Sequence, residues 1–356
     1  MKIGLDLRFI DDNLYSAFTI ELVKGLISQD DENSFILYTN SDMKGFDNVN
    51  TTIKNVGIKN FSLKEQTIYL RILKKDKNNL MLFFNHYKPI FYVGDYFTIL
   101  PSLKDIYYSN FSNYFVKYSF YLLLDKNLKK SKNIICFDKN TLEELIEKYN
   151  IEENKIKYLQ GFFPNSYKLS NTADLKIDIK AKYNIKNKFF IYSGGEGVEK
   201  NYEKLIYVFN KMKKAGLEID LVFLGGTISR NLFLRNIILK LEMQKNIHFM
   251  GVIKPAEKIL FYKDSMGTIF SSFYEPFPFY LTEPLYFDIP IISSDLKNVK
   301  DIFNDTIHYF SPISVNSIYE EIKLFLKKEN VSTNYDNVKQ KYSKENTIKQ
   351  LLEIIR

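Results

Sequence analysis

Residues 271–285 read SSFYEPFPFYLTEPL, a segment that passes from an apolar strand through a loop with two prolines into a short predicted helix. Glu275 precedes this helix and Glu283 lies within it, so two carboxylates eight positions apart bracket the loop. Backbone N–H groups at a helix start can bind phosphate, and neighbouring carboxylates can accept hydrogen bonds from sugar hydroxyls. The segment therefore predicts a site for a nucleotide sugar.

Short apolar runs alternate with amphipathic segments on both sides of this loop, a pattern that indicates parallel strands joined by helices. Strands are predicted at residues 2–7, 34–39, 80–84, 96–100, 133–137, 155–159, 189–193, 220–224, 247–250, 267–271 and 289–293. Helices are predicted at residues 141–149, 201–215 and 231–241, the first of them capped by Asp138. We therefore expect an α/β fold.

The alternation lapses around residues 161–178, where GFFPNS and the polar residues 170–172 indicate a linker. Beyond the linker it restarts from a strand, so we expect two Rossmann-like domains that face each other across a cleft. Ligands in such sheets bind at the carboxyl ends of the strands. The predicted divisions are an N-terminal domain at residues 1–165, a nucleotide-sugar domain at 166–338, and a helix at 339–356 that returns to the first domain.

The composition excludes several classes of protein. The chain has 356 residues, with 50 Lys and Arg against 42 Asp and Glu, which gives a formal net charge of +8. A single cysteine, Cys136, excludes an internal disulfide, and with three histidines it leaves little material for a structural zinc site. Asp6 and Arg8 interrupt any signal-peptide core, and no apolar run reaches the length of a membrane span. We therefore expect a cytoplasmic location.

The two glutamates resemble the Glu-x7-Glu motif of retaining GT-B glycosyltransferases of the family 4 type, or glycosyl transferases group 1. Three upstream segments are similar to that family in the same order: SGGEGVEKN at 193–201, DLVFLGG at 220–226 and IHFMGVI at 247–253. The resemblance extends over residues 193–295. It implies a GT-B fold and the transfer of a hexosyl group from a nucleoside diphosphate sugar to a surface polysaccharide or a lipid-linked glycan.

The resemblance also implies a role for each matching residue. Glu275 and Lys200 would act at the reacting sugar, because Glu275 would contact the sugar hydroxyls and Lys200 would neutralise the diphosphate. Glu283 would bind the ribose. The other implied donor-site residues are Gly194 and Gly195 in the glycine turn, Val252 beside the base, and the N–H groups of Phe279, Tyr280 and Leu281 near the diphosphate. No metal and no cofactor are implied, because the helix start and basic side chains stabilise the leaving diphosphate.

The sequence also departs from the family. Pro278 has no N–H to offer a phosphate where the family usually has glycine, and Glu199 stands where arginine is usual. The first domain lacks the glycine-rich acceptor loop at residues 11–18 and the usual His-Asp pair at residues 96–101, although Asn85 and His86 resemble an acceptor-side loop. These departures favour an alternative, a catalytically silent GT-B subunit that accompanies an active transferase. For a third alternative, an epimerase or a glycan phosphorylase, the sequence has no supporting pattern.

Two basic stretches in the first domain, residues 69–77 and 114–132, alternate cations with aromatic and aliphatic residues at helical spacing. Such helices can lie on an anionic membrane, with their lysines at the headgroups, and this would place the protein at the inner face of the membrane. The alternative is an apolar face in the core and lysines in water. Nucleic acid is not an expected partner, because no nucleic-acid-binding motif accompanies the charge.

Overall fold

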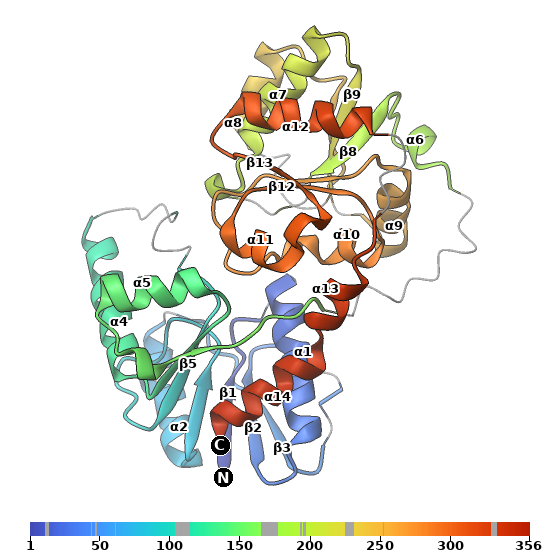
Figure 1. Cartoon of the computed structure of the whole chain (residues 1–356). Coiled ribbons are helices and arrows are strands. Elements are labelled where there is room, and N and C mark those ends of the chain that lie inside the picture. Colours follow the sequence, from blue (N-terminus) through green and yellow to red (C-terminus); the bar gives the residue numbers. More distant parts are fainter. Residues whose placement is uncertain are drawn as a thin grey trace. The chain divides into compact units, whose positions relative to one another are not determined.

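The computed structural model describes residues 1–10, 14–43, 45, 46, 48–60, 62–103, 108, 114–164, 177–192, 194, 197–224, 231–251, 253–328 and 333–356; the side chains of residues 14, 114–117, 119 and 255 are not described. The chain divides into two compact units (Figure 1). The first unit comprises Met1–Pro164 and Tyr342–Arg356, and the second comprises Asn165–Lys341. Most of the linker predicted at 161–178 lies outside the described residues.

The first unit is built on a seven-stranded sheet in the order β3-β2-β1-β4-β5-β6-β7. Every neighbouring pair is parallel. The strands are β1 (Lys2–Asp6), β2 (Ser34–Thr39), β3 (Thr51–Asn55), β4 (Leu80–Phe83), β5 (Tyr96–Leu100), β6 (Asn133–Cys136) and β7 (Ile156–Tyr158). The strand order reverses between β1 and β4, which are the central neighbours. Ligands of open parallel sheets bind beside such a reversal, at the carboxyl ends of the strands.

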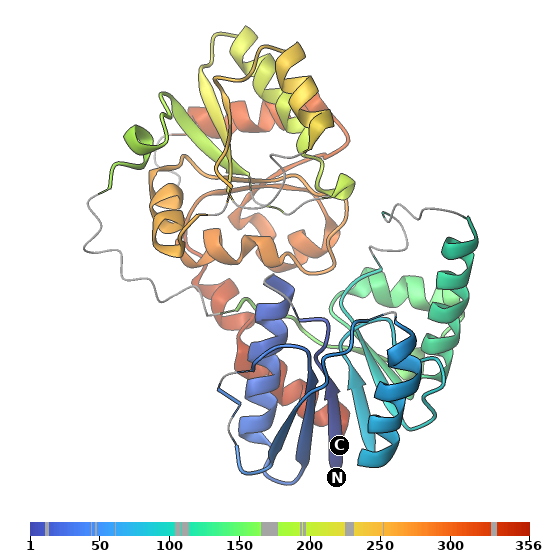
Figure 2. The same cartoon turned by 180° about the vertical axis from the view of Figure 1, so that it is seen from behind.

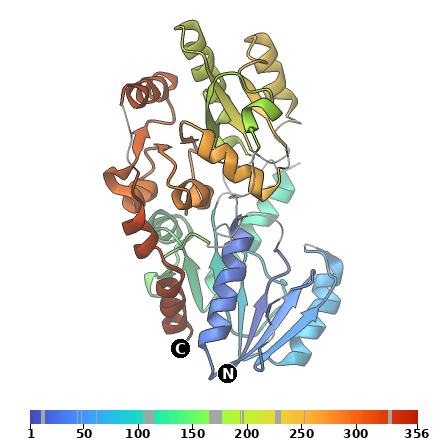
Figure 3. The same cartoon turned by 90° about the vertical axis from the view of Figure 1, so that its right-hand side faces the viewer.

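Helices cover both faces of this sheet. They are α1 (Leu14–Gln29), the π-helical turn η1 (Glu65–Tyr69), α2 (Leu70–Asp76), α4 (Tyr114–Lys130), α5 (Lys139–Tyr149), the 3₁₀ turn η2 (Glu153–Lys155) and α14 (Lys344–Ile355). Residues of η1 and α2 pack on the sheet face formed by Ile36, Tyr38, Met81 and Phe83. Figures 2 and 3 show α1 on the opposite side of the strands from α2.

The last helix, α14, belongs to the first unit although it follows the whole second unit in the sequence. It packs beside α1 (Figure 3), where a Cβ atom at Gly25 would collide with the side chain of Ile348. The Gln350 amide binds the chain after β7 twice, because it accepts a 2.9 Å hydrogen bond from the N–H of Gln160 and donates one of 2.9 Å to the carbonyl of Tyr158. The helix therefore completes a face of the first unit.

The second unit has a six-stranded sheet, also parallel, in the order β10-β9-β8-β11-β12-β13. Its strands are β8 (Lys188–Tyr192), β9 (Ile219–Phe223), β10 (Ile247–Phe249), β11 (Thr268–Phe270), β12 (Ile291–Ser294) and β13 (His308–Phe310). Its helices are α6 (Ile179–Lys182), α7 (Tyr202–Lys214), α8 (Leu232–Lys240), α9 (Pro255–Asp264), α10 (Thr282–Tyr286), α11 (Lys297–Phe303), α12 (Val315–Lys327) and α13 (Asp336–Lys341), with 3₁₀ turns η4 (Val198–Lys200), η6 (Phe279–Leu281) and η7 (Asn304–Thr306).

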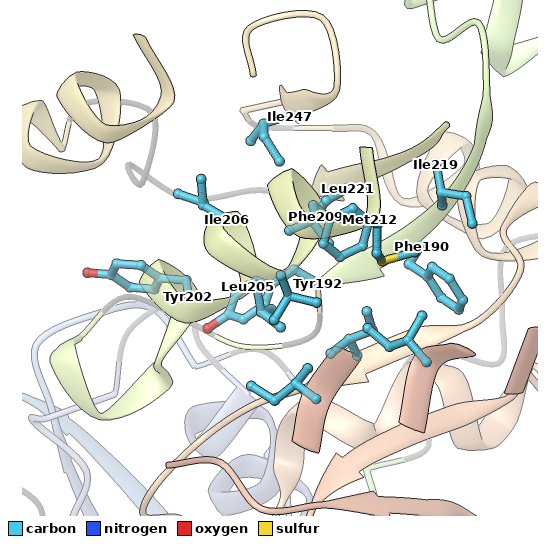
Figure 4. Packing of buried hydrophobic residues seen from close by; sticks show 14 of the residues in the cluster. Phe190, Tyr192, Tyr202, Leu205, Ile206, Phe209, Met212, Ile219, Leu221 and Ile247 are labelled. Atoms are coloured by element: carbon cyan, nitrogen blue, oxygen red, sulfur yellow. The ribbon is translucent and has the colours of Figure 1, made fainter. Parts of the chain in front are cut away.

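One apolar cluster of the second unit lies between its sheet and the helices α7, α8 and α12, and a second one contains residues of α6 and α9. Figure 4 shows Phe190 of β8 and Leu221 of β9 close to Phe209 and Met212 of α7. Six apolar side chains of α7 repeat at helical spacing and are at most 9% exposed. This packing fixes the position of β8 relative to α7, and therefore also the two ends of the loop that joins them.

The α/β fold with parallel sheets is confirmed, and the eleven predicted strands correspond to eleven of the observed ones with boundaries within two residues. Asp138 caps α5 as predicted, because its side chain accepts a hydrogen bond from the N–H of Thr141. The strands β3 and β13 were not predicted. The unit boundaries lie at residues 164/165 and 341/342, close to the predicted divisions at 165/166 and 338/339.

Candidate functional site

Lys200 and Glu275 of the predicted donor site lie in the loops after β8 and β11, the neighbours between which the strand order of the second sheet reverses. The chain after β8 leads through Gly197 into the turn η4, and the chain after β11 leads through Glu275 into η6 and α10. Gly197 has φ of +138°, and a Cβ atom there would collide with the carboxylate of Glu199. Both loops therefore leave the carboxyl ends of adjacent strands, the usual location of ligands in parallel sheets.

Lys200 and Glu275 form an ion pair between these two loops, with Nζ bound to Oε2. The Lys200 side chain is 3% exposed and that of Glu275 is 12% exposed, so both charges have largely left water. The Lys200 ammonium also lies over the ring of Tyr280, 4.5 Å from its centroid. Sequence reasoning assigned both residues to the reacting centre, and the structure brings them together from 75 positions apart.

Backbone contacts fix the position of Lys200. Its carbonyl oxygen accepts hydrogen bonds from Ser271 Oγ at 2.8 Å and from the Tyr192 hydroxyl at 3.3 Å. Burial raises the pKa of Tyr192 well above its ordinary value, and the nearby Tyr280 hydroxyl raises it further, so the phenol remains neutral and can donate. Neutral hydrogen bonds therefore attach the loop after β8 to Ser271, which follows β11, and to Tyr192 of β8 itself, in addition to the ion pair.

The loop that carries Glu275 is held from its other side by Asn298 of α11. The Asn298 amide donates to the carbonyl of Glu275 and, at 2.7 Å, to the carbonyl of Pro276. Both carbonyl oxygens thus have a side-chain donor on α11. Asn298 therefore orients the carboxylate of Glu275 through its backbone.

Glu283 is buried at the start of α10, with its side chain 7% exposed. Lys258 Nζ donates to one carboxylate oxygen at 2.6 Å, and the Tyr262 hydroxyl donates to the other at 2.9 Å. Both donors come from α9, four positions apart, and therefore from the same face of that helix. The carboxylate is held in one orientation by a cation and a phenol.

The other predicted donor-site residues are the N–H donors of η6, the two glycines after β8, and Val252. The N–H of Phe279 donates to the carbonyl of Phe277 at 2.8 Å, and the N–H of Leu281 donates to that of Pro278 at 2.9 Å. These two donors are engaged within the turn η6, which precedes a helix of only five residues. Gly194 follows β8, and a Cβ atom there would collide with the Tyr192 ring. Gly195 and Val252 lie outside the described residues.

Sequence reasoning did not find Tyr280 as a ring partner, nor Asn298, Lys258 and Tyr262. Lys258 and Tyr262 had a detectable signal, because residues four apart in a helix share a face. For Asn298 the sequence had no signal, because a lone asparagine at a helix start is ordinarily a cap.

In the first unit, a buried ionic cluster lies at the carboxyl end of the central strand β1. Arg8 donates from Nε and Nη2 to the two carboxylate oxygens of Asp6, each at 2.8 Å, and from Nη2 to Glu65 at 2.6 Å. These three side chains are at most 1% exposed. The Arg8 guanidinium also stacks 3.7 Å from the centroid of the Tyr69 ring. Burial acts to lower the pKa of Arg8, but the charge of Asp6 and hydrogen bonds to both carboxylates raise it overall.

Asn85 and His86, the predicted acceptor-side residues, follow the neighbouring strand β4. The His86 ring lies edge-on to the ring of Phe120 in α4, with centroids 5.1 Å apart. Asn85 Oδ1 is buried and accepts no hydrogen bond within the described part of the chain. Both residues and the Arg8 cluster therefore lie at adjacent strand ends, at the strand-order reversal of the first sheet.

Lys88 is a buried lysine two residues further along. Its ammonium lies 4.9 Å from the centroid of the Tyr96 ring and donates to the carbonyls of Pro89 and Tyr92, each at 3.3 Å. The pKa of Lys88 is lowered to about 8, first by burial and then by the charges of Lys130 and Lys126. The folded protein therefore holds a cation there at a cost in stability.

We expect Lys88→Met to raise the thermal midpoint at pH 7 by about 3 °C or more, because the variant buries no charge. The wild type loses the Lys88 proton in the folded state above pH 8, whereas the unfolded chain keeps it until about pH 10.4. The unfolded state binds more protons in that window, so wild-type stability rises with pH and the difference between the proteins closes. Thermal unfolding at pH 7 and pH 10 measures this. A midpoint difference that is equal at both pH values contradicts the prediction, and the exposed Lys132→Met serves as the control.

The described residues contain neither a metal-binding cluster nor a helix suited to span a membrane. No group of three or more His, Cys, Asp or Glu side chains in the described ranges is arranged to hold a metal ion. Among the described helices, none combines the length and apolar character that a membrane span requires.

Sequence comparison finds a family resemblance that lies mainly in the second unit. Residues 176–345 match the sequence model of the family described as "Glycosyl transferases group 1". An uncharacterized glycosyltransferase of Methanocaldococcus jannaschii is 29% identical over 181 residues, which are 49% of this chain and 43% of the relative. The match therefore spans less than half of that relative's length.

Solved structures share the fold of both units. Sucrose-phosphate synthase from Thermosynechococcus elongatus has a TM-score of 0.73 at 12% identity, with 100% of this chain and 98% of that chain covered. HepE from Anabaena, in complex with UDP-glucose, has a TM-score of 0.73 at 12% identity, with 100% and 99% covered. Likeness at this identity concerns the fold, and the family match lies in the second unit. The chain therefore has the GT-B fold of these structures, and its residues 176–345 resemble the glycosyl transferases of group 1.

Proposed function

We propose that the chain is a retaining glycosyltransferase that moves a hexosyl group from a nucleoside diphosphate sugar to a surface polysaccharide or a lipid-linked glycan. The observation that carries this proposal is the buried Lys200–Glu275 ion pair against Tyr280, at the strand-order reversal of the second sheet. An ion pair that is mostly desolvated contributes little net stability, so its presence at a ligand-binding edge favours a functional role.

In this proposal Glu275 accepts hydrogen bonds from hydroxyls of the donor sugar, and Lys200 shares its charge between Glu275 and the diphosphate. Glu283 accepts from the ribose hydroxyls, while Lys258 and Tyr262 keep its carboxylate in place. Charge-assisted hydrogen bonds of this kind contribute about 1.5–3 kcal/mol each. The fold neighbour HepE was solved with UDP-glucose, which supports a UDP-sugar as the first donor to test.

The proposed reaction retains the anomeric configuration and needs no metal ion. The bond between the anomeric carbon and the diphosphate oxygen breaks, and the bond to the acceptor oxygen forms on the same face of the sugar. The acceptor proton passes to the leaving phosphate oxygen. The ammonium of Lys200 stabilises the charge that develops on that phosphate, the role an ion has in other transferases. Asn85 and His86 of the first unit would contact the acceptor.

A second candidate function is a catalytically silent GT-B subunit that accompanies an active transferase. Two observations favour it: Pro278 has no N–H, and the N–H groups of Phe279 and Leu281 are bound within their own turn. A diphosphate would then find fewer backbone donors than the family usually offers. The buried pair of Lys200 and Glu275 opposes this candidate, because a scaffold has no chemical requirement for it.

Calorimetric titration with UDP, GDP and ADP distinguishes the two candidates. We expect one nucleotide to bind selectively, and Glu283→Ala to weaken its binding about 10- to 100-fold, since the ribose loses a charged acceptor. The matched control is Glu320→Ala, which removes an exposed carboxylate of α12 and should leave affinity unchanged.

If no nucleotide binds to the folded protein, the silent-subunit function replaces the transferase. If a nucleotide binds equally well to Glu283→Ala and to the wild type, the assignment of the ribose site is wrong. Release of the nucleoside diphosphate from the matching nucleotide sugar then measures catalysis directly.

A further inference from the structure

A segment with exposed apolar side chains precedes β5 in the first unit. Residues 89–94, here called the 89–94 loop, join β4 to β5. Phe91 is 65% exposed and Val93 is 88% exposed. Both side chains belong to a short segment that also contains Gly94, so they extend from one small part of the surface.

One side of this loop is attached to η1 and α2. The N–H of Ile90 donates to Gln66 Oε1 at 2.8 Å, and Gln66 Nε2 donates to the Tyr87 hydroxyl at 2.9 Å. The Tyr92 ring packs on the apolar cluster that contains Tyr69 of η1. The first basic stretch, residues 69–77, therefore begins directly beside the loop.

The chain that continues from the loop into β5 contacts α4 and the residues that follow it. Lys132, which follows α4, lies 3.5 Å from Asp95, the residue directly after the loop. The Tyr96 hydroxyl donates to the carbonyl of Asn127 at 2.7 Å. The second basic stretch, residues 114–132, therefore flanks the same loop, and in Figure 1 both α2 and α4 lie on the left-hand side of the first unit.

The charges around the loop are predominantly positive. Exposed cations on η1, α2 and the segment before them are Lys64, Arg71, Lys74 and Lys75, and those on α4 and its end are Lys126, Lys129, Lys130 and Lys132. The carboxylates nearby are Asp125, paired with Lys129 at 2.9 Å, and Asp95, 3.5 Å from Lys132. Further apolar side chains are exposed on the two helical elements: Ile68 at 45%, Tyr118 at 65% and Leu122 at 52%.

A buried helix face does not account for these apolar residues. Leu70 and Leu73 of α2, and Leu124 and Leu128 of α4, already fill the core side of their helices. The exposed apolar side chains are therefore additional to those that fill the core. Exposed apolar groups between two rows of cations are typical of surfaces that enter the interfacial region of a bilayer.

We propose that the 89–94 loop, together with η1, α2 and α4, forms a docking surface for a bilayer that contains anionic lipid. Phe91 and Val93 enter the interface, and the flanking lysines and arginine contact the headgroups. The surface has a charge and an apolar content that match such a bilayer, whatever ligand the second unit binds. Only its purpose, the approach to a lipid-linked acceptor, rests on the proposed function.

Flotation of the full chain with vesicles tests the surface. We use vesicles of phosphatidylcholine alone and of phosphatidylcholine mixed with phosphatidylglycerol, in ~0.1 M and ~1 M salt. The chain should bind the anionic vesicles, and high salt should weaken this binding. The double variant Phe91→Ser/Val93→Ser should bind at least about tenfold more weakly than the wild type, because two apolar groups are lost. Lys126→Ala/Lys130→Ala should also weaken binding about tenfold.

The matched control is Leu232→Ser/Phe233→Ser, which removes two apolar side chains of α8 that are 72% and 59% exposed. The proposal is overturned if the chain does not bind anionic vesicles, or if the control weakens binding as much as the loop variant does. It is also overturned if an RNA or an acidic protein displaces the wild-type chain from the vesicles. Nucleotide titration in the absence of lipid tests the donor site separately, so failure of one proposal can be distinguished from failure of the other.

Discussion

Lys200→Met should reduce nucleotide-sugar turnover at least 100-fold and lower the free energy of unfolding by about 3 kcal/mol. Methionine keeps the unbranched apolar stem of Lys200 but leaves the carboxylate of Glu275, 12% exposed, without its cation. The loss of stability arises from that uncompensated charge, and the loss of turnover arises from the missing charge at the diphosphate. Thermal unfolding and release of nucleoside diphosphate measure the two effects.

The double variant Lys200→Met/Glu275→Gln separates the two roles. It removes both charges, so stability should return close to the wild-type value while turnover stays low. The control Lys214→Met, at an exposed position of α7, should change neither quantity. If the double variant regains turnover together with stability, the ion pair is a structural element and the assigned role in the reaction is wrong.

Arg8→Met should destabilise the first unit more strongly than any exposed substitution, by about 4 kcal/mol, which corresponds to a fall of about 10 °C in its thermal midpoint. The change leaves two carboxylates, those of Asp6 and Glu65, buried at 0–1% exposure with no guanidinium between them. Arg8→Lys should also destabilise, because one ammonium cannot reproduce the paired bonds from Nε and Nη2.

A rescue variant keeps this prediction testable if Arg8→Met does not fold. Arg8→Met/Asp6→Asn/Glu65→Gln removes all three charges and should recover most of the lost midpoint. Arg235→Met, at an exposed position of α8, is the matched control and should shift the midpoint by no more than about 1 °C. If Arg8→Met and Arg235→Met have equal midpoints, the cluster does not stabilise the first unit.

The sequence predicted that Lys200 and Glu275 lie together, because each follows a strand of the same predicted sheet. The spacing of Glu275 and Glu283 and the position of Lys200 after a strand are visible in consecutive residues. Parallel sheets then bring strand ends together at one edge, so these residues could be assigned to one site without knowledge of any side-chain contact. The strands themselves were predicted from apolar runs, which buried parallel strands require.

The parts that sequence reasoning missed depend on contacts between distant segments. The edge strand β3 has three exposed positions among its five, so it lacks an apolar run. Arg8 and Asp6 were noted only as charges that interrupt a signal peptide, because their partner Glu65 is 57 positions away. Phe91 and Val93 lie in a loop without sequence periodicity, so the sequence does not indicate whether their side chains are buried or exposed. Only the fold determines which apolar residues remain in water.

The position of α14 has a consequence for biosynthesis. Residues 342–356 pack beside α1, yet the ribosome makes them after every residue of the second unit. Domains of a nascent chain generally fold as they emerge, but the first unit here lacks one of its helices until synthesis has passed the second. During that interval the surface of α1 around Gly25 is uncovered, and chaperones or premature association would act on that surface first.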